Sequence, residues 1–175
     1  LWVRPLTPPA SRRVHGLKYD GSTRLAAFMA DRMRRPAEAL VAHLGGEGRP
    51  VVVPVPTTPA RIRARGYNQA ALLAEELSAR LGVPTLDALR RVGGGASQTA
   101  LAPDARRENV RDVFRTAPGA RVAGAVVVLV DDVLTTGATA GEAACLLGAA
   151  GAEGVGVVTF ARALPELGPG RAAAA

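Results

Sequence analysis

The chain has 175 residues and a formal net charge of +7, with 22 Lys and Arg residues against 15 Asp and Glu residues. Hydrophobic residues make up 48% of it and charged residues 21%, which excludes wholesale disorder and indicates one ordinary domain. The single cysteine, Cys145, excludes a disulfide framework and a cysteine-based zinc site within the chain. Its Ala- and Leu-rich surroundings predict a buried, inert thiol.

The charge is unevenly distributed along the chain. Residues 1–121 carry 20 basic and 10 acidic side chains, and residues 122–175 carry 2 basic and 5 acidic ones. All the bases except Lys18 are arginines. One interpretation of the surplus is an anionic partner, either a phosphorylated small ligand or a nucleic-acid backbone. The other is an arginine-rich surface that merely keeps the protein in solution.

The first elements in chain order are helical. Residues 1–20 lack clear periodicity and contain three prolines, so we expect no helix there. The apolar spacing of residues 24–33 predicts a helix capped by Ser22 or Thr23. We expect Pro36 to interrupt this helix.

The next elements are a strand and a helix. Consecutive valines indicate a buried strand over residues 51–56, ended by its prolines. Leucines at helical spacing predict an amphipathic helix over residues 68–81, and Gly82 is a suitable residue to end it. Residues 83–92 are compatible with a further strand.

The last elements alternate between strand and helix. Residues 91–109 form a long polar stretch with several glycines, which a short helix is expected to follow. Strands are predicted at residues 126–130 and 155–162, with a helix over residues 139–150 between them. Because the strands are continuous apolar runs, the pattern predicts an α/β fold in which helices cover both faces of a mainly parallel sheet.

Nothing in the sequence predicts a membrane protein. The longest apolar run, residues 122–130, has 9 residues, whereas a spanning helix needs about 20. No signal-peptide pattern is present, so we expect a cytoplasmic protein.

The stretch VVVLVDDVLTTGATAGEA, residues 126–143, carries the clearest chemistry. Asp131 and Asp132 are expected at the carboxyl end of a buried strand, where ligands bind in open α/β sheets. The segment TTGAT that follows combines three hydroxyls, a glycine and the start of a helix, a combination suited to binding phosphate. Carboxylates accept hydrogen bonds and therefore suit sugar hydroxyls. Together the two halves suit a phosphorylated ribose.

Other interpretations of this stretch explain less of it. No Gly-Lys-Ser/Thr follows, which excludes a Walker loop. Paired acids after a strand also bind metals directly, but the threonine-rich turn would then have no role. Residues 148–154 resemble a dinucleotide fingerprint, yet they end a helix instead of beginning one. The remaining alternative is a turn whose threonines only cap the helix.

The segment VVVLVDDVLTTGAT resembles the signature of type I phosphoribosyltransferases, with a hydrophobic strand, two acids and a Thr/Gly phosphate turn. This resemblance implies a type I phosphoribosyltransferase-like fold, with a mainly parallel central sheet flanked by helices and a small hood with a flexible loop.

Three further segments resemble the ComF family. PVPTTPARIRARGYNQAALLAEEL, residues 54–77, is similar to its Pro-Val-Pro…Arg-Gly-Phe-Asn-Gln-Ala segment, with Tyr67 in the aromatic position. QTALAPDARRENVRDVF, residues 98–114, is similar to its Gln-Thr…Leu…Arg-x-x-Asn…Phe segment. LKYDG, residues 17–21, matches its lysine-aromatic-x-Gly motif, so the likeness covers about residues 15–163.

The resemblance implies a site for phosphoribosyl pyrophosphate. Asp131 and Asp132 would hold the 2′ and 3′ hydroxyls, and the turn would hold the 5′-phosphate. The turn residues are Thr135, Thr136, Gly137, Ala138 and Thr139. The loop after the first valine-rich strand, with Thr57, Thr58 and Arg61, would face the pyrophosphate.

The resemblance also implies a mobile cover over residues 91–106. Its flexible-loop residues would be Gly93, Gly94, Gly95, Gln98 and Thr99. Arg65 and Arg106 would act with the two acids in catalysis, although a solvated surface position is the alternative for each arginine. Mg²⁺ would be carried with the phosphoribosyl pyrophosphate, with no separate metal site in the protein. Charge stabilisation on the departing pyrophosphate and exclusion of water are what such a reaction asks of the protein.

The implied function is transfer of a phosphoribosyl group to an acceptor that the sequence does not identify. The alternative is a non-catalytic competence factor for DNA uptake that binds single-stranded DNA or partner proteins of the competence machinery, since ComF proteins are linked to uptake of transforming DNA. A third interpretation is a regulator that binds a ribose phosphate without turnover.

We expect three parts in the chain: an N-terminal segment at 1–22, a phosphoribosyltransferase-like domain at 23–163 and a disordered tail at 164–175. Many ComF proteins carry an N-terminal four-cysteine zinc element, which this chain lacks. One interpretation of the N-terminal segment is therefore that it is the remnant of a truncated element.

Overall fold

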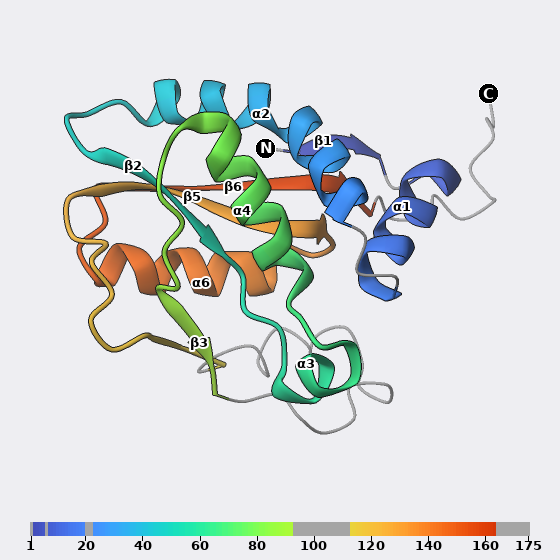
Figure 1. Ribbon diagram of the computed structural model, residues 1–175. Coiled ribbons are helices and arrows are strands. Elements are labelled where there is room, and N and C mark those ends of the chain that lie inside the picture. The colour runs from blue at the N-terminus through green and yellow to red at the C-terminus, as the bar shows by residue number, and fades with distance from the viewer. Residues whose placement is uncertain (1, 6, 20–22, 93–112, 164–175) are drawn as a thin grey trace, which may run out of the picture.

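Two valine-rich strands pair side by side in a four-stranded parallel sheet (Figure 1). The computed structural model describes residues 2–5, 7–19, 23–92 and 113–163. The strands are β1 (Trp2–Pro5), β2 (Arg49–Pro54), β5 (Ala125–Leu134) and β6 (Gly154–Arg162), and their order in the sheet is β1-β6-β5-β2. All three pairings are parallel, which confirms the predicted sheet.

Helices cover both faces of this sheet. Figure 1 shows α2 (Thr23–Leu44) and α4 (Gln69–Leu81) on one side and α6 (Ala138–Ala149) on the other. Side chains alternate along the strands, so that Val52 faces the α2 and α4 side, whereas Val51 belongs to the core on the α6 side. Both are fully buried, so the valine runs are continuous because each face of the sheet needs apolar residues.

The described helices and strands include a second, smaller sheet on the α6 side. The strands β3 (Leu89–Arg91) and β4 (Phe114–Thr116) pair antiparallel, and Leu89 and Phe114 join the core on that side. Residues 93–112 between these strands, including the predicted short helix, lie outside the described residues. The predicted strand at 83–92 is thus shorter than expected, although Thr85 forms a single bridge to Val52.

The expectation of no helix before residue 20 is wrong. Residues Pro8–Tyr19 form the helix α1, because Pro8 and Pro9 occupy its first positions, where no backbone N–H donor is needed. Leu17 of α1 is fully buried in the core with α2. Since β1 also pairs with β6, residues 2–19 contribute a strand and a helix to the same layered fold.

Two further expectations about prolines and boundaries are corrected. Pro36 lies inside α2 and does not interrupt it. Met33, Ala37 and other buried residues continue one apolar face through the proline, which offsets a cost of about 3 kcal/mol for a proline inside a helix. β2 begins before its valines and contains Pro50, which an edge strand tolerates.

The helices α4 and α6 agree with the predictions, and Gly82 ends α4 in a left-handed conformation. Cys145 is exposed on α6, contrary to the expected buried thiol, because the buried face of that helix consists of Ala140, Ala143 and Leu147. In the described part of the chain, no helix is long and apolar enough to cross a membrane. The predicted tail at 164–175 lies outside the described residues.

Candidate functional site

The two predicted acids lie within β5, not beyond it. The strand continues to Leu134, so Asp131 and Asp132 are the first two of its last four residues. Asp131 is partly buried, whereas Asp132 is only 4% exposed. Each carboxylate accepts a hydrogen bond from the next amide: Asp132 N–H donates to Asp131 Oδ1 at 2.8 Å, and Val133 N–H donates to Asp132 Oδ1 at 2.9 Å.

Asp132 has a basic partner that the sequence did not predict. Lys18 Nζ, from the last turn of α1, lies 2.8 Å from Asp132 Oδ2. The side chain of Lys18 is 27% exposed and that of Asp132 is 5% exposed. The two residues are far apart in the sequence, so only the packing of α1 against the sheet brings them together.

The acid pair carries an unusual charge balance. Burial raises the pKa of Asp131 well above its ordinary value, and the adjacent Asp132 carboxylate raises it further by repulsion. Lys18 acts in the opposite direction on the pKa of Asp131, and the effect of burial is larger. The Lys18 ammonium therefore contacts one of two adjacent carboxylates, and the site disfavours ionisation of both carboxylates without a ligand.

The predicted phosphate turn follows directly after β5. Gly137 adopts φ 81°, a left-handed conformation that favours glycine, and forms the N-cap of α6. No side chain caps this helix, so the amide donors of its first turn are not satisfied by a cap. Thr135 and Thr136 are exposed beside it, and Thr136 Oγ1 accepts only a long bond of 3.4 Å from Ala138 N–H.

The predicted pyrophosphate loop leaves the sheet at the same edge. β2 and β5 are parallel, with Pro54 opposite Val130, so the loop after β2 begins beside the last four residues of β5. Thr57 is only 7% exposed, and its hydroxyl has no hydrogen-bond partner among the described residues. A buried polar atom of this kind is a feature that a ligand would satisfy.

The same loop also has structural roles. Thr58 caps α3 (Pro59–Arg65) by accepting a bond of 3.2 Å from Arg61 N–H. The side chain of Arg61 is exposed, and Arg65 donates to Gln69 Oε1 at 3.3 Å.

Two side chains after α3 connect the loop to its neighbours. Tyr67 Oη donates to the carbonyl oxygen of Leu17 in α1 at 2.7 Å. Asn68 Nδ2 donates to the carbonyl oxygen of Val55 at 3.1 Å, while Asn68 Oδ1 caps α4. The ComF-like segment therefore joins the first valine-rich strand, α1 and α4 at one place.

Sequence reasoning also missed a partly buried arginine in the small sheet. Arg91 is the last residue of β3, and its guanidinium lies 5.3 Å from the ring centre of Phe114. Burial lowers the pKa of Arg91 and nearby Arg61 lowers it further, whereas Glu142 and Asp131 raise it. Arg91 is thus a partly buried cation at the start of the predicted cover, and the charges of Arg61 and Asp131 both act on its pKa.

Glu142 of α6 holds the small sheet in place. Its Oε1 accepts from the N–H groups of Val113 at 2.7 Å and Phe114 at 3.4 Å. The sequence did not predict this contact, because the partners of Glu142 are backbone amides of a segment distant in the chain.

The structure thus brings together the acid pair, the turn at 135–139 and the loop at 57–61 at the carboxyl ends of β5 and β2. The remaining predicted site residues lie outside the described residues: Arg106, Gly93, Gly94, Gly95, Gln98 and Thr99.

The donors at this edge suit a metal that arrives with a ligand. Within the described ranges, no group of three or more His, Cys, Asp or Glu side chains could hold a metal ion. Mg²⁺ commonly binds through one or two carboxylates, waters and substrate phosphates, without an all-protein cage. One of the two carboxylates here already contacts Lys18. The residues present therefore fit an ion carried on a pyrophosphate better than one held by the protein alone.

Comparison with known proteins identifies the family. The sequence profile of the phosphoribosyl transferase domain matches residues 29–172. The chain is 36% identical to DNA utilization protein YhgH of Salmonella typhi over 166 residues, which cover 93% of this chain and 71% of that protein.

Two further relatives cover less of the chain. It is 40% identical to competence protein F of Haemophilus influenzae, over 64% of this chain and 50% of that protein. It is 41% identical to adenine phosphoribosyltransferase of Erythrobacter litoralis, over 62% of this chain and 57% of that protein. The profile match and the relatives at this level of identity show that the chain belongs to the ComF family of phosphoribosyltransferase-domain proteins.

Proposed function

We propose that the chain binds phosphoribosyl pyrophosphate and transfers its phosphoribosyl group to an acceptor. One observation carries this proposal: an acid pair and the uncapped start of α6, with Gly137 at its N-cap, follow each other at the end of β5. The first half supplies acceptors for sugar hydroxyls, and the second supplies amide donors for a phosphate. A ribose 5-phosphate unit has both groups.

The loop after β2 is the proposed site of the pyrophosphate. The buried hydroxyl of Thr57 has no hydrogen-bond partner among the described residues and could donate to a pyrophosphate oxygen. The exposed Arg61 supplies positive charge in the same loop. Arg65 and Arg106 remain proposed cations of the same reaction. Residues Gly93–Gly95, Gln98 and Thr99 remain the proposed flexible loop.

The proposed reaction breaks the bond between C1 of the ribose and the pyrophosphate oxygen, and pyrophosphate leaves with the bonding electrons. A nucleophilic atom of the acceptor forms the new bond to C1 and loses its proton. Mg²⁺ bound to the pyrophosphate would neutralise charge on this leaving group. The contribution of the chain is to orient the ribose through the acid pair, bind the phosphates and exclude water.

Calorimetric titration of phosphoribosyl pyrophosphate, with and without Mg²⁺, tests binding, and an assay for released pyrophosphate tests turnover. We expect binding that Mg²⁺ strengthens, and pyrophosphate release that the double variant Asp131→Asn, Asp132→Asn abolishes. If phosphoribosyl pyrophosphate binds but no pyrophosphate is released, whether a nucleobase or water is the acceptor, the result would favour a ribose-phosphate sensor. No binding by the unaltered chain would refute the proposal.

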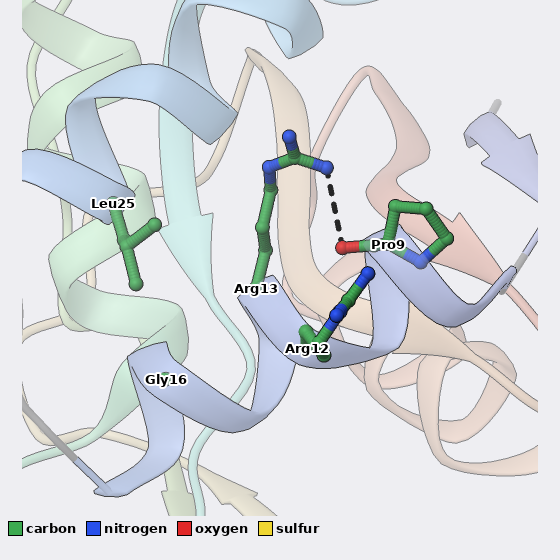
Figure 2. Close-up of a pocket in the computed structure, with 5 residues that line it drawn as sticks. All are labelled: Pro9, Arg12, Arg13, Gly16 and Leu25. Carbon is green, nitrogen blue, oxygen red and sulfur yellow. Dashed lines mark hydrogen bonds between the residues drawn. The ribbon is translucent and has the colours of Figure 1, made fainter.

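A second candidate function, binding of single-stranded DNA, is favoured by a cluster of arginines on α1 and α2. Arg13 and Arg32 both lie against the ring of Phe28, 4.9 and 3.6 Å from its centre. The exposed Arg12 and the half-buried Arg13 line a shallow cavity of about 360 Å³ (Figure 2). This cavity involves none of the residues predicted for the ribose phosphate. Two relatives are named for DNA utilization and competence.

DNA binding by this arginine cluster would be led by the phosphate backbone. We expect the affinity for a labelled single-stranded oligonucleotide to fall steeply between about 50 and 200 mM salt. The double variant Arg12→Gln, Arg13→Gln should weaken binding and flatten its salt dependence. Arg34→Gln is the matched control, because Arg34 is exposed and paired with Glu38 on α2. Absent or salt-independent binding would remove this candidate.

A further inference from the structure

The ion pair between Lys18 and Asp132 is asymmetric in its exposure. Asp132 Oδ2 is fully buried, and Lys18 Nζ lies 2.8 Å from it. Asp132 Oδ1 already accepts from Val133 N–H. More than a quarter of the Lys18 side chain, at 27%, is exposed. A ligand that approaches the acid pair can therefore reach Lys18, but it cannot reach Asp132 Oδ2 unless Lys18 moves away.

We propose that Lys18 is a ligand-contacting residue of the ribose site, and that Asp132 is a positioning residue that acts through Lys18. This inference rests on the proposed function, and it gives the two members of the acid pair different roles. Asp131 accepts a hydrogen bond from one ribose hydroxyl. The Lys18 ammonium donates a hydrogen bond to an oxygen of the same diol.

The chemistry of the ammonium supports this assignment. It has three N–H donors and no acceptor. Within the described part of the chain, Asp132 is its one partner, so two donors remain for a ligand. Ribose hydroxyls both donate and accept hydrogen bonds, and a lysine beside a carboxylate satisfies both directions. Two carboxylates alone would satisfy only the donors of the diol.

The backbone of α1 is fixed where Lys18 leaves it. Leu17 is fully buried, and its carbonyl oxygen accepts from Tyr67 Oη at 2.7 Å. Lys18 is therefore attached to an anchored turn, and Asp132 restrains the far end of its side chain. Restraint at both ends reduces the conformational entropy that a long side chain loses when it contacts a ligand.

A purely structural ion pair is a weaker explanation. Burying a carboxylate costs several kcal/mol, and a buried pair often contributes no more stability than apolar residues of similar volume. Asp131 adjoins Asp132 in β5 and is itself partly buried, and the positive charge of Lys18 lowers its pKa. The structural explanation leaves this second carboxylate without a role.

Calorimetric titration of two ligands separates contact with the ribose from a general effect of charge. Ribose 5-phosphate contains the diol, and inorganic phosphate lacks it. For Lys18→Met we expect about a tenfold loss of ribose 5-phosphate affinity, typical of a lost hydrogen bond to a charged group, and less than about a twofold change for inorganic phosphate. Lys18→Arg should restore most of the affinity, and Arg34→Met, on the exposed surface of α2, should change neither. Equal losses for both ligands would overturn the inference.

A double-mutant cycle tests whether Asp132 acts through Lys18. If it does, Asp132→Asn costs little additional ribose 5-phosphate affinity once Lys18 is methionine, because both changes remove the same contact. Additive losses would mean that Asp132 contacts the ligand itself and would overturn the positioning role. Thermal unfolding of each variant identifies any that fail to fold.

The unaltered chain provides an independent measurement. Lys18 is the only lysine among the 175 residues, so lysine labelled with ¹⁵N gives a single Nζ resonance. We expect ribose 5-phosphate to shift this resonance and inorganic phosphate to leave it nearly unchanged. If ribose 5-phosphate binds without shifting it, this inference is wrong and the proposed function survives. If ribose 5-phosphate and phosphoribosyl pyrophosphate both fail to bind, the two fall together.

Discussion

The phenolic hydroxyl of Tyr67 donates a hydrogen bond of 2.7 Å to the main-chain carbonyl oxygen of Leu17. The bond joins the last turn of α1 to the short segment between α3 and α4. Leu17 immediately precedes Lys18, whose ammonium contacts Asp132. A hydroxyl at the aromatic position of the ComF-like segment, where the family motif has phenylalanine, thus fixes the backbone that presents Lys18.

The variant Tyr67→Phe removes this hydroxyl and keeps the ring. We expect the free energy of unfolding in urea to fall by about 0.5–1.5 kcal/mol, the usual net contribution of one hydrogen bond. We also expect a several-fold loss of ribose 5-phosphate affinity by calorimetry, because Lys18 is held less firmly. Thr85→Val is a suitable control, since Thr85 Oγ1 donates to the carbonyl oxygen of Ala74 in α4 at 3.5 Å, away from Leu17 and Tyr67 in the chain. If both variants change stability but neither changes the affinity for ribose 5-phosphate, the bond between Tyr67 and Leu17 does not influence ligand binding through Lys18.

The central sheet could be predicted from the sequence because its signals are local. The valines of β2 and β5 form continuous apolar runs, and Gly82 ends α4 with the left-handed conformation that glycine favours. The acid pair and the turn at 135–139 adjoin one another in the chain, so their common location follows from the end of a single strand.

The parts that could not be predicted depend on contacts between distant residues. Adjacent prolines such as Pro8 and Pro9 occur both where no helix forms and in the first turn of a helix. Here the packing of Leu17 in the core favours the helix α1. The contact of Lys18 with Asp132, and that of Glu142 with the amides of Val113 and Phe114, likewise depend on how elements pack. No spacing in the sequence encodes them.

Gly137→Ala tests the phosphate turn. An added Cβ would meet only Leu134 Cδ1, at an ordinary contact distance of 3.8 Å, so the cost arises from φ 81° and not from a clash. We expect a loss of about 1–2 kcal/mol in the free energy of unfolding, typical of the left-handed conformation. We also expect weaker binding of inorganic phosphate and ribose 5-phosphate, because the amides at the start of α6 are displaced.

Gly119→Ala is the matched control for this variant. Gly119 also has a positive φ, 74°, and an added Cβ would contact nothing within 4 Å. It lies between β4 and β5, away from the predicted turn. The two variants should lose similar stability in urea denaturation, but only Gly137→Ala should lose phosphate affinity. Equal phosphate affinities would exclude the turn as the phosphate site.

Asp131→Asn should stabilise the protein at neutral pH while it weakens ribose 5-phosphate binding. The folded-state pKa of Asp131 is raised, mainly by burial and next by Asp132. Its protonated form is therefore favoured by folding, and the stability that this provides is present at low pH and lost as the pH rises through the folded-state pKa. The asparagine has no charge to bury, so its melting temperature should exceed that of the unaltered chain by a few degrees at pH 7.

The difference in melting temperature should disappear on acidification. At a pH below 3.8, the ordinary pKa of aspartate, Asp131 is protonated in both the folded and the unfolded chain. Neither the unaltered chain nor the variant then buries a charge at this position, so their stabilities no longer differ on this account. Melting curves by circular dichroism across this pH range provide the measurement. A stabilisation that is constant with pH, or a destabilisation at pH 7, would show that burial of the ionised Asp131 is not a cost to the fold.

Glu142→Ala should loosen the small sheet without weakening α6. Glu142 Oε1 accepts hydrogen bonds from the amides of Val113 and Phe114, and alanine leaves both donors without this acceptor while it favours the helix. We expect a loss of about 1.5–3 kcal/mol in the free energy of unfolding, in line with hydrogen bonds to a charged group. Hydrogen exchange at these two amides should accelerate more than at the amides of β5. Glu142→Gln retains an acceptor oxygen and should recover part of the protection, whereas Glu75→Ala on the exposed face of α4 should change neither measurement. Unchanged exchange at Val113 in Glu142→Ala would mean that the backbone pairing of β3 with β4 alone holds the small sheet in place.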